Sequence, residues 1–131
     1  NMTVVPTEVW ENRTSMTIEK REILADTGGA GKWRGGPGQE VVFRNDTGNL
    51  MEIALMGQRT EFAAKGLFGG GDGALRLYEM NGKIVDPKAR IELAPGDRIT
   101  MREAGGGGYG NPVDRNPEAT RIDRARGYVT T

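Results

Sequence analysis

Apolar and polar residues alternate along the chain in short runs, which is typical of strands with one buried face. Between Met16 and Leu24 a charged patch interrupts the alternation and indicates a shift in register near Arg21. Similar runs bounded by turn residues predict seven strands, over 16–24, 39–44, 50–56, 74–80, 83–85, 91–93 and 98–101. Short strands at this close spacing favour a mainly β fold, a sandwich or barrel-like antiparallel β domain with Gly-rich loops and a short C-terminal helix.

Three turns between these runs predict how neighbouring strands are connected. The residues at 45–49 (Asn-Asp-Thr-Gly-Asn) accept left-handed backbone conformations, so we expect 39–57 to form a hairpin. Asn81-Gly82 is the strongest short hairpin signal in the chain. The residues at 94–97 (Ala-Pro-Gly-Asp) predict a turn between two further strands. The segment 60–65 fits either one helical turn or a bulged extended segment.

The end of the chain changes character and predicts a short helix over 117–126. Asn116 is a suitable N-cap, Pro117 fits the first helical position, Glu118 lies in the first turn and Gly127 is a typical stop. The helix carries a weak apolar stripe that favours docking over membrane insertion, formed by Ala119, Ile122 and Ala125.

Glycine is the outlier of the composition, with 21 residues of 131, roughly twice the average usage. The block at 26–38 contains six glycines and Pro37, so we expect an irregular loop with positive φ at several positions. Few apolar residues and many loops indicate a domain that is stabilised by contacts with neighbouring polypeptide. We divide the chain into a glycine-rich β domain (1–113) and a C-terminal helical extension (114–131).

Charge and missing residue types exclude several function classes. Lys plus Arg and Asp plus Glu each number 18, and no run of one sign suggests binding to nucleic acid or a membrane. Without cysteine or histidine the commonest metal ligands and the commonest general base are missing. The N-terminal residues lack the basic and apolar regions of a signal peptide, so we expect a soluble, cytoplasmic protein. Because the chain starts at Asn1, we also expect a processed product or part of something longer.

The segment 26–36 is the first candidate for ligand binding, because consecutive glycine N–H groups can converge on an anion. It lacks the spacing and the Ser or Thr of a P-loop, so nucleotide binding by this chain alone is disfavoured. Asp26, Lys32 and Arg34 can bind a carboxylate or phosphate, or brace the loop as an ion pair. Trp33 can stack on a ligand, but a core or interface anchor is the commoner role, so we expect this loop to pack Trp33 and to aim Arg34 toward a partner surface.

Acid–base chemistry has few candidates in this sequence. Asp72, in a glycine-rich stretch, is the best placed carboxylate, although Asp beside Gly is ordinary turn chemistry. Tyr109, flanked by glycines, is better explained as a packing plug than as an acid. We assign no catalytic and no metal-binding residue. The candidates for a ligand or interface loop are Asp26, Gly28, Gly29, Lys32, Trp33, Arg34, Gly35, Gly36, Asp72 and Tyr109.

Six motifs in order carry a family resemblance across essentially the whole chain. They lie at 1–11, 16–24, 26–36 (Asp-Thr-Gly-Gly-Ala-Gly-Lys-Trp-Arg-Gly-Gly), 66–74 (Gly-Leu-Phe-Gly-Gly-Gly-Asp-Gly-Ala), 93–97 and 105–112 (Gly-Gly-Gly-Gly-Tyr-Gly-Asn-Pro). In this order they resemble the C-terminal region of the hydantoinase B/oxoprolinase family. The closing segments 115–118 and 127–129 look like the family's last helix.

The resemblance implies part of an ATP-dependent enzyme complex. Its partners would be the remainder of a hydantoinase B-type subunit and an ATP-binding hydantoinase A-type subunit of actin-like fold. ATP and a divalent metal are implied for the whole complex, neither bound by this segment, and the substrate would be a small cyclic amide. The equivalent part of an ATP-dependent ketone carboxylase of the acetone or acetophenone type is the alternative. The segment 57–65 departs from the family pattern, which leaves the branch undecided.

Two further hypotheses remain beside the enzyme component. The chain can be a separate, non-catalytic assembly subunit without substrate contact. It can also be a free-standing domain that binds a small anion at 26–36. Calorimetry with ATP, phosphate and carboxylates tests the last of these.

Overall fold

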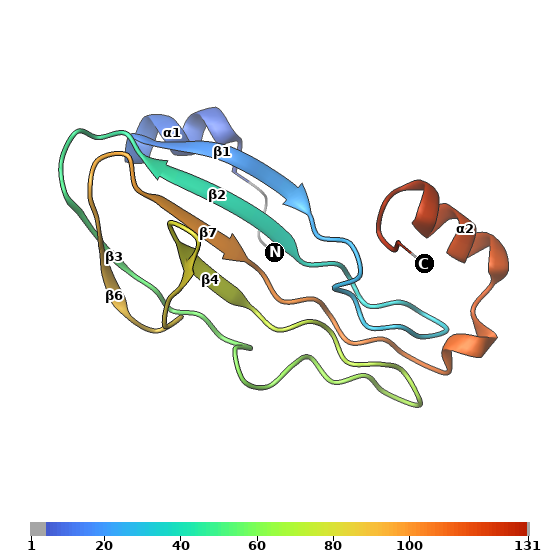
Figure 1. The fold of residues 1–131 in the computed structure, drawn as a ribbon. Coiled ribbons are helices and arrows are strands. Elements are labelled where there is room, and N and C mark those ends of the chain that lie inside the picture. Colours follow the sequence, from blue (N-terminus) through green and yellow to red (C-terminus); the bar gives the residue numbers. More distant parts are fainter. Residues whose placement is uncertain (1–4, 131) are drawn as a thin grey trace.

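The computed structural model describes residues 5–130, and the outer ends of the predicted parts 1–113 and 114–131 lie outside that range. The described residues form seven strands in two antiparallel sheets (Figure 1). The larger sheet has the order β1-β2-β7-β4-β5, and β3 pairs with β6 in a separate two-stranded sheet. The strands are β1 (Met16–Ile23), β2 (Gln39–Asn45), β3 (Met51–Ala54), β4 (Leu77–Met80), β5 (Lys83–Ile84), β6 (Arg90–Leu93) and β7 (Arg98–Arg102).

One face of the larger sheet is apolar and packs against the two-stranded sheet of β3 and β6. In register, Phe43 lies opposite Ile18 on β1 and Ile99 on β7, and side chains of directly opposed residues share a face. The buried core joins side chains from both sheets, namely Met16, Leu55, Tyr78, Leu93 and Ile99. The fold is therefore a small two-layer β domain, as the sequence predicted.

The opposite face of the larger sheet is charged, and a β-bulge in β1 produces the change of pattern. The register shifts between Ile18 and Lys20, so Lys20 lies opposite Val42 instead of on the face of Ile18. The bulge lies at Glu19, two residues before the predicted position at Arg21. The bulge places Lys20 on the charged face, where it pairs with Glu40 at 2.7 Å, and moves Arg21 to the face of Val41.

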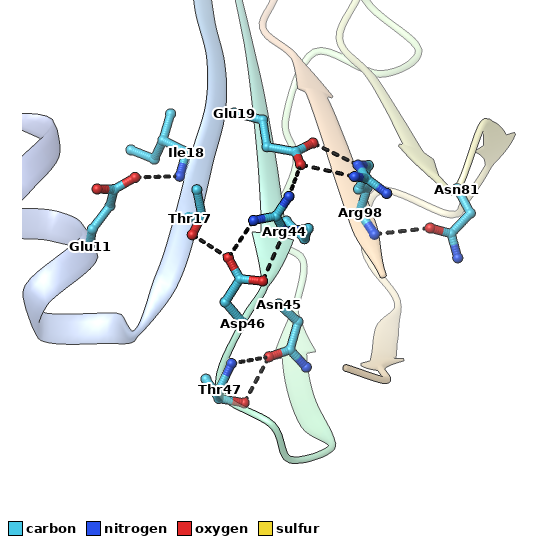
Figure 2. Close-up of polar contacts among 10 residues, drawn as sticks. All are labelled: Glu11, Thr17, Ile18, Glu19, Arg44, Asn45, Asp46, Thr47, Asn81 and Arg98. Atoms are coloured by element: carbon cyan, nitrogen blue, oxygen red, sulfur yellow. Dashed lines mark hydrogen bonds and ion pairs between the residues drawn. The ribbon is translucent and has the colours of Figure 1, made fainter. Parts of the chain in front are cut away.

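The charged face is held by ion pairs that cross between strands. Glu19 lies between two arginines, and its carboxylate accepts from Arg44 Nη1 and from Arg98 Nε, each at 2.6 Å (Figure 2). Arg44 also donates to Asp46, and this contact with that of Thr17 lowers the pKa of Asp46 to about 2. Each arginine on this face shown in Figure 2 thus has a carboxylate beside it.

The predicted hairpin over 39–57 is wrong. β2 pairs with β1 and β7, whereas β3 leaves the sheet and pairs with β6. The strands before and after the bend therefore form one long two-stranded ribbon, β2 with β7 and then β3 with β6. At the bend, Asn45 N–H donates to the Asp97 carbonyl and Gly96 N–H donates to the Asn45 carbonyl. Both predicted turns exist, but they lie side by side and carry the ribbon from one sheet to the other.

Asn45 fixes this bend with its side chain. It is fully buried, and its amide donates to the carbonyl oxygens of Asn49 and Leu93, both at 2.8 Å. Its amide oxygen accepts from the backbone and the hydroxyl of Thr47. Because its polar atoms have these hydrogen-bond partners, burial of Asn45 costs little folding free energy, and its side chain defines the path of the bend.

One other local prediction is confirmed and one element was missed. Asn81 (φ 49°) and Gly82 (φ 78°) form the predicted tight turn, here between β4 and β5. The segment 60–65 is neither helix nor strand. Helix α1 (Thr7–Thr14) was not predicted, and its Trp10 ring packs on Phe43 with 4.5 Å between centroids. The Glu11 carboxylate accepts from the Ile18 N–H at 2.7 Å and ties the helix to β1 (Figure 2).

The glycine-rich segments extend beyond the end of the larger sheet, and the C-terminal helix lies beside them (Figure 1). A 3-10 turn, η1 (Pro112–Asp114), leads into helix α2 (Pro117–Ala125), which ends one residue before the predicted position. The Asn116 side chain accepts from Glu118 N–H, as predicted for the N-cap, and Gly127 has φ 70°. In residues 5–130 no helix is long and apolar enough to cross a membrane.

Candidate functional site

The three glycine-rich segments meet in one bundle, formed by residues 26–36, 64–74 and 105–110. Each segment bonds to both of the others through its backbone. The Gly29 N–H donates to the Gly106 carbonyl at 2.8 Å, and the Gly71 N–H donates to the Ala30 carbonyl at 2.7 Å. The Gly108 N–H closes the triangle by donating to the Gly71 carbonyl at 2.9 Å. Motifs that lie far apart in the sequence therefore build one structure, which we call the glycine bundle.

Glycine is needed in this bundle because the backbones touch. A Cβ added at Gly35 would overlap the carbonyl oxygen of Gly106, and one added at Gly29 would overlap that of Gly71. The expectation of positive φ in 26–38 is wrong for its glycines. In that segment Asp26 has a positive φ (59°) and none of the six glycines does. The reason for glycine here is the absence of a side chain, not a left-handed conformation.

Several N–H groups of the segment 26–36 are used for hydrogen bonds within the bundle. The N–H groups of Gly29, Lys32, Trp33 and Gly35 all donate to carbonyl oxygens of the protein. A phosphate cradle requires successive N–H groups that converge on the anion. The geometry thus favours a structural role for 26–36 over a cradle formed by its backbone.

Helix α2 is fixed to the bundle by a carboxylate between two guanidinium groups. Asp123 is buried and pairs with Arg34 through Nε at 3.0 Å and with Arg115 through Nη2 at 2.5 Å. The hydrogen bond from Arg34, with a further one from Arg115, lowers the pKa of Asp123. Arg34 also donates to the Gly35 carbonyl and stacks 5.1 Å from the Tyr128 ring centre. We call Arg34, Arg115 and Asp123 the clamp.

The clamp changes two expectations from the sequence. Arg34 does not point to a partner surface, because its guanidinium is held inside this chain by Asp123. Helix α2 also docks through another face than predicted, since Ile122 and Ala125 are exposed and Ala119 is half-buried. No local pattern marks Asp123 as the docking residue, because its partners lie 8 and 89 positions away.

Asp26 ties the end of the chain to the same segment. Its carboxylate accepts from the N–H of Thr130 at 3.0 Å and from the Thr130 hydroxyl at 2.5 Å, and these bonds lower its pKa. Its own N–H donates to the Tyr128 carbonyl at 3.0 Å. Asp26, Lys32 and Arg34 therefore do not brace one another. Asp26 and Arg34 each hold the C-terminal segment instead.

A cavity of about 550 Å³ lies between the glycine bundle and α2, a size within the usual range for small-molecule sites. Its wall includes Gly28, Gly29 and the clamp, and also Asp26 and Asp72. Each of these carboxylates already has a partner. Asp72 accepts from Lys65 Nζ at 2.6 Å and from Gly66 N–H, and both contacts lower its pKa. A carboxylate held in its charged form is a poor general acid, so the cavity wall offers polar contacts more readily than proton transfer.

Aromatic side chains gather at the outer end of the bundle. Tyr109 pairs through its backbone with Trp33 and bridges to Leu67 on the other side. The Phe68 ring meets the edge of the Tyr109 ring, with 5.2 Å between centroids. Trp33 is 66% exposed, so its ring is not a core anchor of this chain, and the interface role stays a prediction. Gly36, the remaining candidate, has open space where a Cβ would lie.

The family model for hydantoinase B/oxoprolinase matches residues 1–112 of this chain. The chain belongs to the hydantoinase B/oxoprolinase family. The matched residues include β1 to β7 and all three segments of the glycine bundle, and they end where η1 begins. Family membership thus concerns the sheet and the bundle, and α2 lies outside the matched range.

Named relatives are much longer than this chain. The 5-oxoprolinase of Saccharomyces cerevisiae is 30% identical over 115 residues, which cover 82% of this chain and 9% of the yeast protein. The caprolactamase subunit beta of Pseudomonas jessenii is 28% identical over 132 residues, covering 94% and 22%. The chain therefore spans less than a quarter of each of these relatives.

Two solved structures share the fold. The ATP-dependent caprolactamase from Pseudomonas jessenii superposes with a TM-score of 0.78 at 22% identity, over 95% of this chain and 23% of that chain. A nucleotide-free acetone carboxylase gives a TM-score of 0.75 at 23% identity, over 95% and 21%. At this level of identity the likeness concerns the fold.

Proposed function

We propose that this chain is the C-terminal β domain, or a small subunit, of an ATP-dependent hydantoinase/oxoprolinase-type enzyme complex that opens a cyclic amide. The observation that carries the proposal is the family match over residues 1–112. The names of the sequence relatives support the substrate class, because 5-oxoproline and caprolactam both contain an amide within a ring.

In this proposal the domain shapes and supports a site that other polypeptide completes. ATP and a divalent metal belong to the rest of the complex, which includes the remainder of a hydantoinase B-type subunit and an actin-like hydantoinase A-type subunit. The engaged state of Asp26, Asp72 and Asp123 supports this division, because each of these carboxylates already has a partner within this chain. Residues 1–113 act as the glycine-rich β domain and 114–131 as an extension that the clamp fixes to it.

The cavity beside the clamp is the part of this chain with room for a small-molecule substrate. A polar lining of two guanidinium groups next to glycine backbone, with three carboxylates also in the wall, suits the uncharged carbonyl oxygen of an amide. Arg34 and Arg115 would orient such a group and would not exchange protons with it, because guanidinium stays protonated.

A ketone carboxylase of the acetone type is the second candidate, supported by the fold shared with acetone carboxylase. The third is an assembly subunit without substrate contact. Purification of the native complex through a tag on this chain separates them. We expect ATP-dependent ring opening of 5-oxoproline, hydantoin or caprolactam, with phosphate released in step with the ring-opened product and no product without ATP.

Several outcomes would redirect the proposal. Consumption of acetone or acetophenone with bicarbonate and ATP, without ring opening, favours the carboxylase branch. An intact complex with an actin-like subunit that turns over neither substrate class contradicts both enzyme proposals. The mass of the polypeptide that contains residues 1–131 then shows whether this segment belongs to a longer subunit.

A further inference from the structure

Four large side chains form an exposed patch at the outer end of the glycine bundle, which we call the aromatic tip. Trp33, Leu67, Phe68 and Tyr109 are 66%, 58%, 78% and 49% exposed. They come from all three segments of the bundle, and backbone bridges join Trp33 and Leu67 to Tyr109. Contiguous exposed apolar groups of this kind mark interaction sites, whereas single exposed apolar residues are ordinary.

The tip presents its rings on a preformed backbone. Phe68 has φ 51°, an unfavourable conformation for a bulky residue, and Gly69 follows with φ 91°. The Gly70 N–H closes this turn by donating to the Leu67 carbonyl at 3.0 Å. A strained residue that exposes a ring costs folding free energy, which is expected where the ring serves a contact outside the domain.

Resting on the proposed function, we propose that the aromatic tip docks this domain onto the remaining, larger part of a hydantoinase B-type subunit. The length of the relatives supports this occupant. In both solved structures, the region that superposes on 95% of this chain is under a quarter of a much longer polypeptide. The family match over 1–112 includes all four tip residues, so the surface belongs to the part of the chain that the family shares.

A hollow beside the tip gives the contact a polar border. It measures about 340 Å³ and is lined by Trp33 and Ala119, with the charged residues Lys32, Asp114 and Arg115 around them. Aromatic anchors surrounded by polar groups are typical of protein interfaces. A hollow lined by Trp33 and Ala119 together with polar Asn116 and charges of both signs fits a polypeptide side chain better than a lipid surface.

Photo-crosslinking in the assembled complex tests the docking. A photoreactive benzoyl-phenylalanine replaces Phe68 and, in the control, Ile84, which is also highly exposed but lies on β5 at the edge of the larger sheet. Mass spectrometry identifies the linked peptides. We expect peptides from the hydantoinase B-type polypeptide outside the stretch equivalent to 1–131, several-fold more abundant from position 68 than from position 84.

Each other outcome overturns the inference. These outcomes are a link from position 68 to a second copy of this chain, to the A-type subunit or to an unrelated protein, and a yield no higher than at position 84. ATP-dependent ring opening by the same sample keeps this test separate from the proposed function. If activity persists while the crosslink fails, the tip assignment is wrong and the enzyme assignment stands.

Two substitutions provide a second measurement that does not depend on the crosslinker. Phe68→Gly removes the ring and its contact with Tyr109 but relieves the strained φ, so the domain itself should still fold. We expect it to weaken association with the rest of the subunit, or protection of the tip from protease, about 30-fold, as for an aromatic anchor. Ile84→Ser should leave both unchanged. Unaltered association and protection in Phe68→Gly would contradict the docking role.

Discussion

In the sheet, side chains fill the space between the backbones, whereas in the glycine bundle the backbones themselves are in contact. The sheet buries Leu93 and Ile99 between two layers and pairs its charges across strands. The bundle has almost no side chains at its centre, and its hydrogen bonds join segments that are not strands. The sheet should therefore be sensitive to the loss of atoms, and the bundle to their addition.

The largest effect of an added side chain is expected at Gly35. A Cβ in Gly35→Ala overlaps the Gly106 carbonyl, and a backbone atom cannot move aside as a side chain can. We expect a loss of about 3 kcal/mol or more in the free energy of unfolding, measured by urea denaturation. The neighbouring Gly36→Ala, with open space at the Cβ position, should stay within about 0.5 kcal/mol of the unaltered protein. Equal denaturation midpoints for the two variants would refute the close-contact explanation.

The sheet should show the opposite sensitivity at Leu93. This side chain is 0% exposed and lies in the core between the layers. Leu93→Ala should cost about 3 kcal/mol in unfolding free energy, because it removes buried methyl groups and leaves a cavity. Leu50→Ala is the control, since that leucine is 61% exposed. A similar cost for both would show that the core is not the stabilising region that its burial indicates.

The clamp links the bundle to α2, and Asp123→Asn should separate them. The change leaves two guanidinium groups without a charged partner, so we expect a cost of about 2 kcal/mol, confined to the attachment of α2. Hydrogen exchange measures it as faster exchange in α2 than in β7. Equally accelerated exchange in both elements would mean that the clamp stabilises the whole domain.

The same clamp predicts a pH dependence. Arg34 and Arg115 lower the pKa of Asp123 below its ordinary value of 3.8. A carboxyl with a lower pKa in the folded state stabilises fully above the ordinary pKa and loses its contribution as the pH falls through the lowered value. We therefore expect α2 to lose exchange protection as the pH falls below 3.8, ahead of β7, and this step to be absent from Asp123→Asn.

The smallest effect is expected on the charged face of the sheet. Glu19→Gln removes an exposed carboxylate between Arg44 and Arg98, and exposed pairs contribute little. We expect a slight decrease in the denaturation midpoint that disappears near 1 M salt, where the screening length is about 3 Å. A large decrease that persists in high salt would show that these ion pairs contribute substantially to the free energy of unfolding.

Local signals predicted the elements that depend on neighbouring residues. Asn81-Gly82 closes a hairpin, and Asn116, Pro117 and Gly127 bound α2 close to where the sequence placed it. Helix α1 was missed because it is short and its contact with the domain comes from Trp10 and Glu11, which meet strands later in the chain. The hairpin over 39–57 failed because its turn is compatible with more than one pairing, and β2 pairs with β7 while β3 pairs with β6.

The candidate site shows the same division. Sequence drew attention to 26–36, 66–74 and 105–112, but gave no sign that these segments touch. The candidates Arg34 and Asp26 are bound by Asp123 and Thr130, which lie 89 and 104 positions away. Pairing at such a separation follows from the path of the chain, which residue types alone do not specify.

By itself the sequence determined the family, the β class of the fold, the turns and the capped helix, because these follow from the chemistry of adjacent residues and from motifs in a fixed order. The requirement for glycine at these positions became clear only from the tertiary structure. Three distant segments approach until their backbones touch, and only a residue without a side chain permits that distance. The same approach exposes the aromatic tip and creates the cavity that α2 covers.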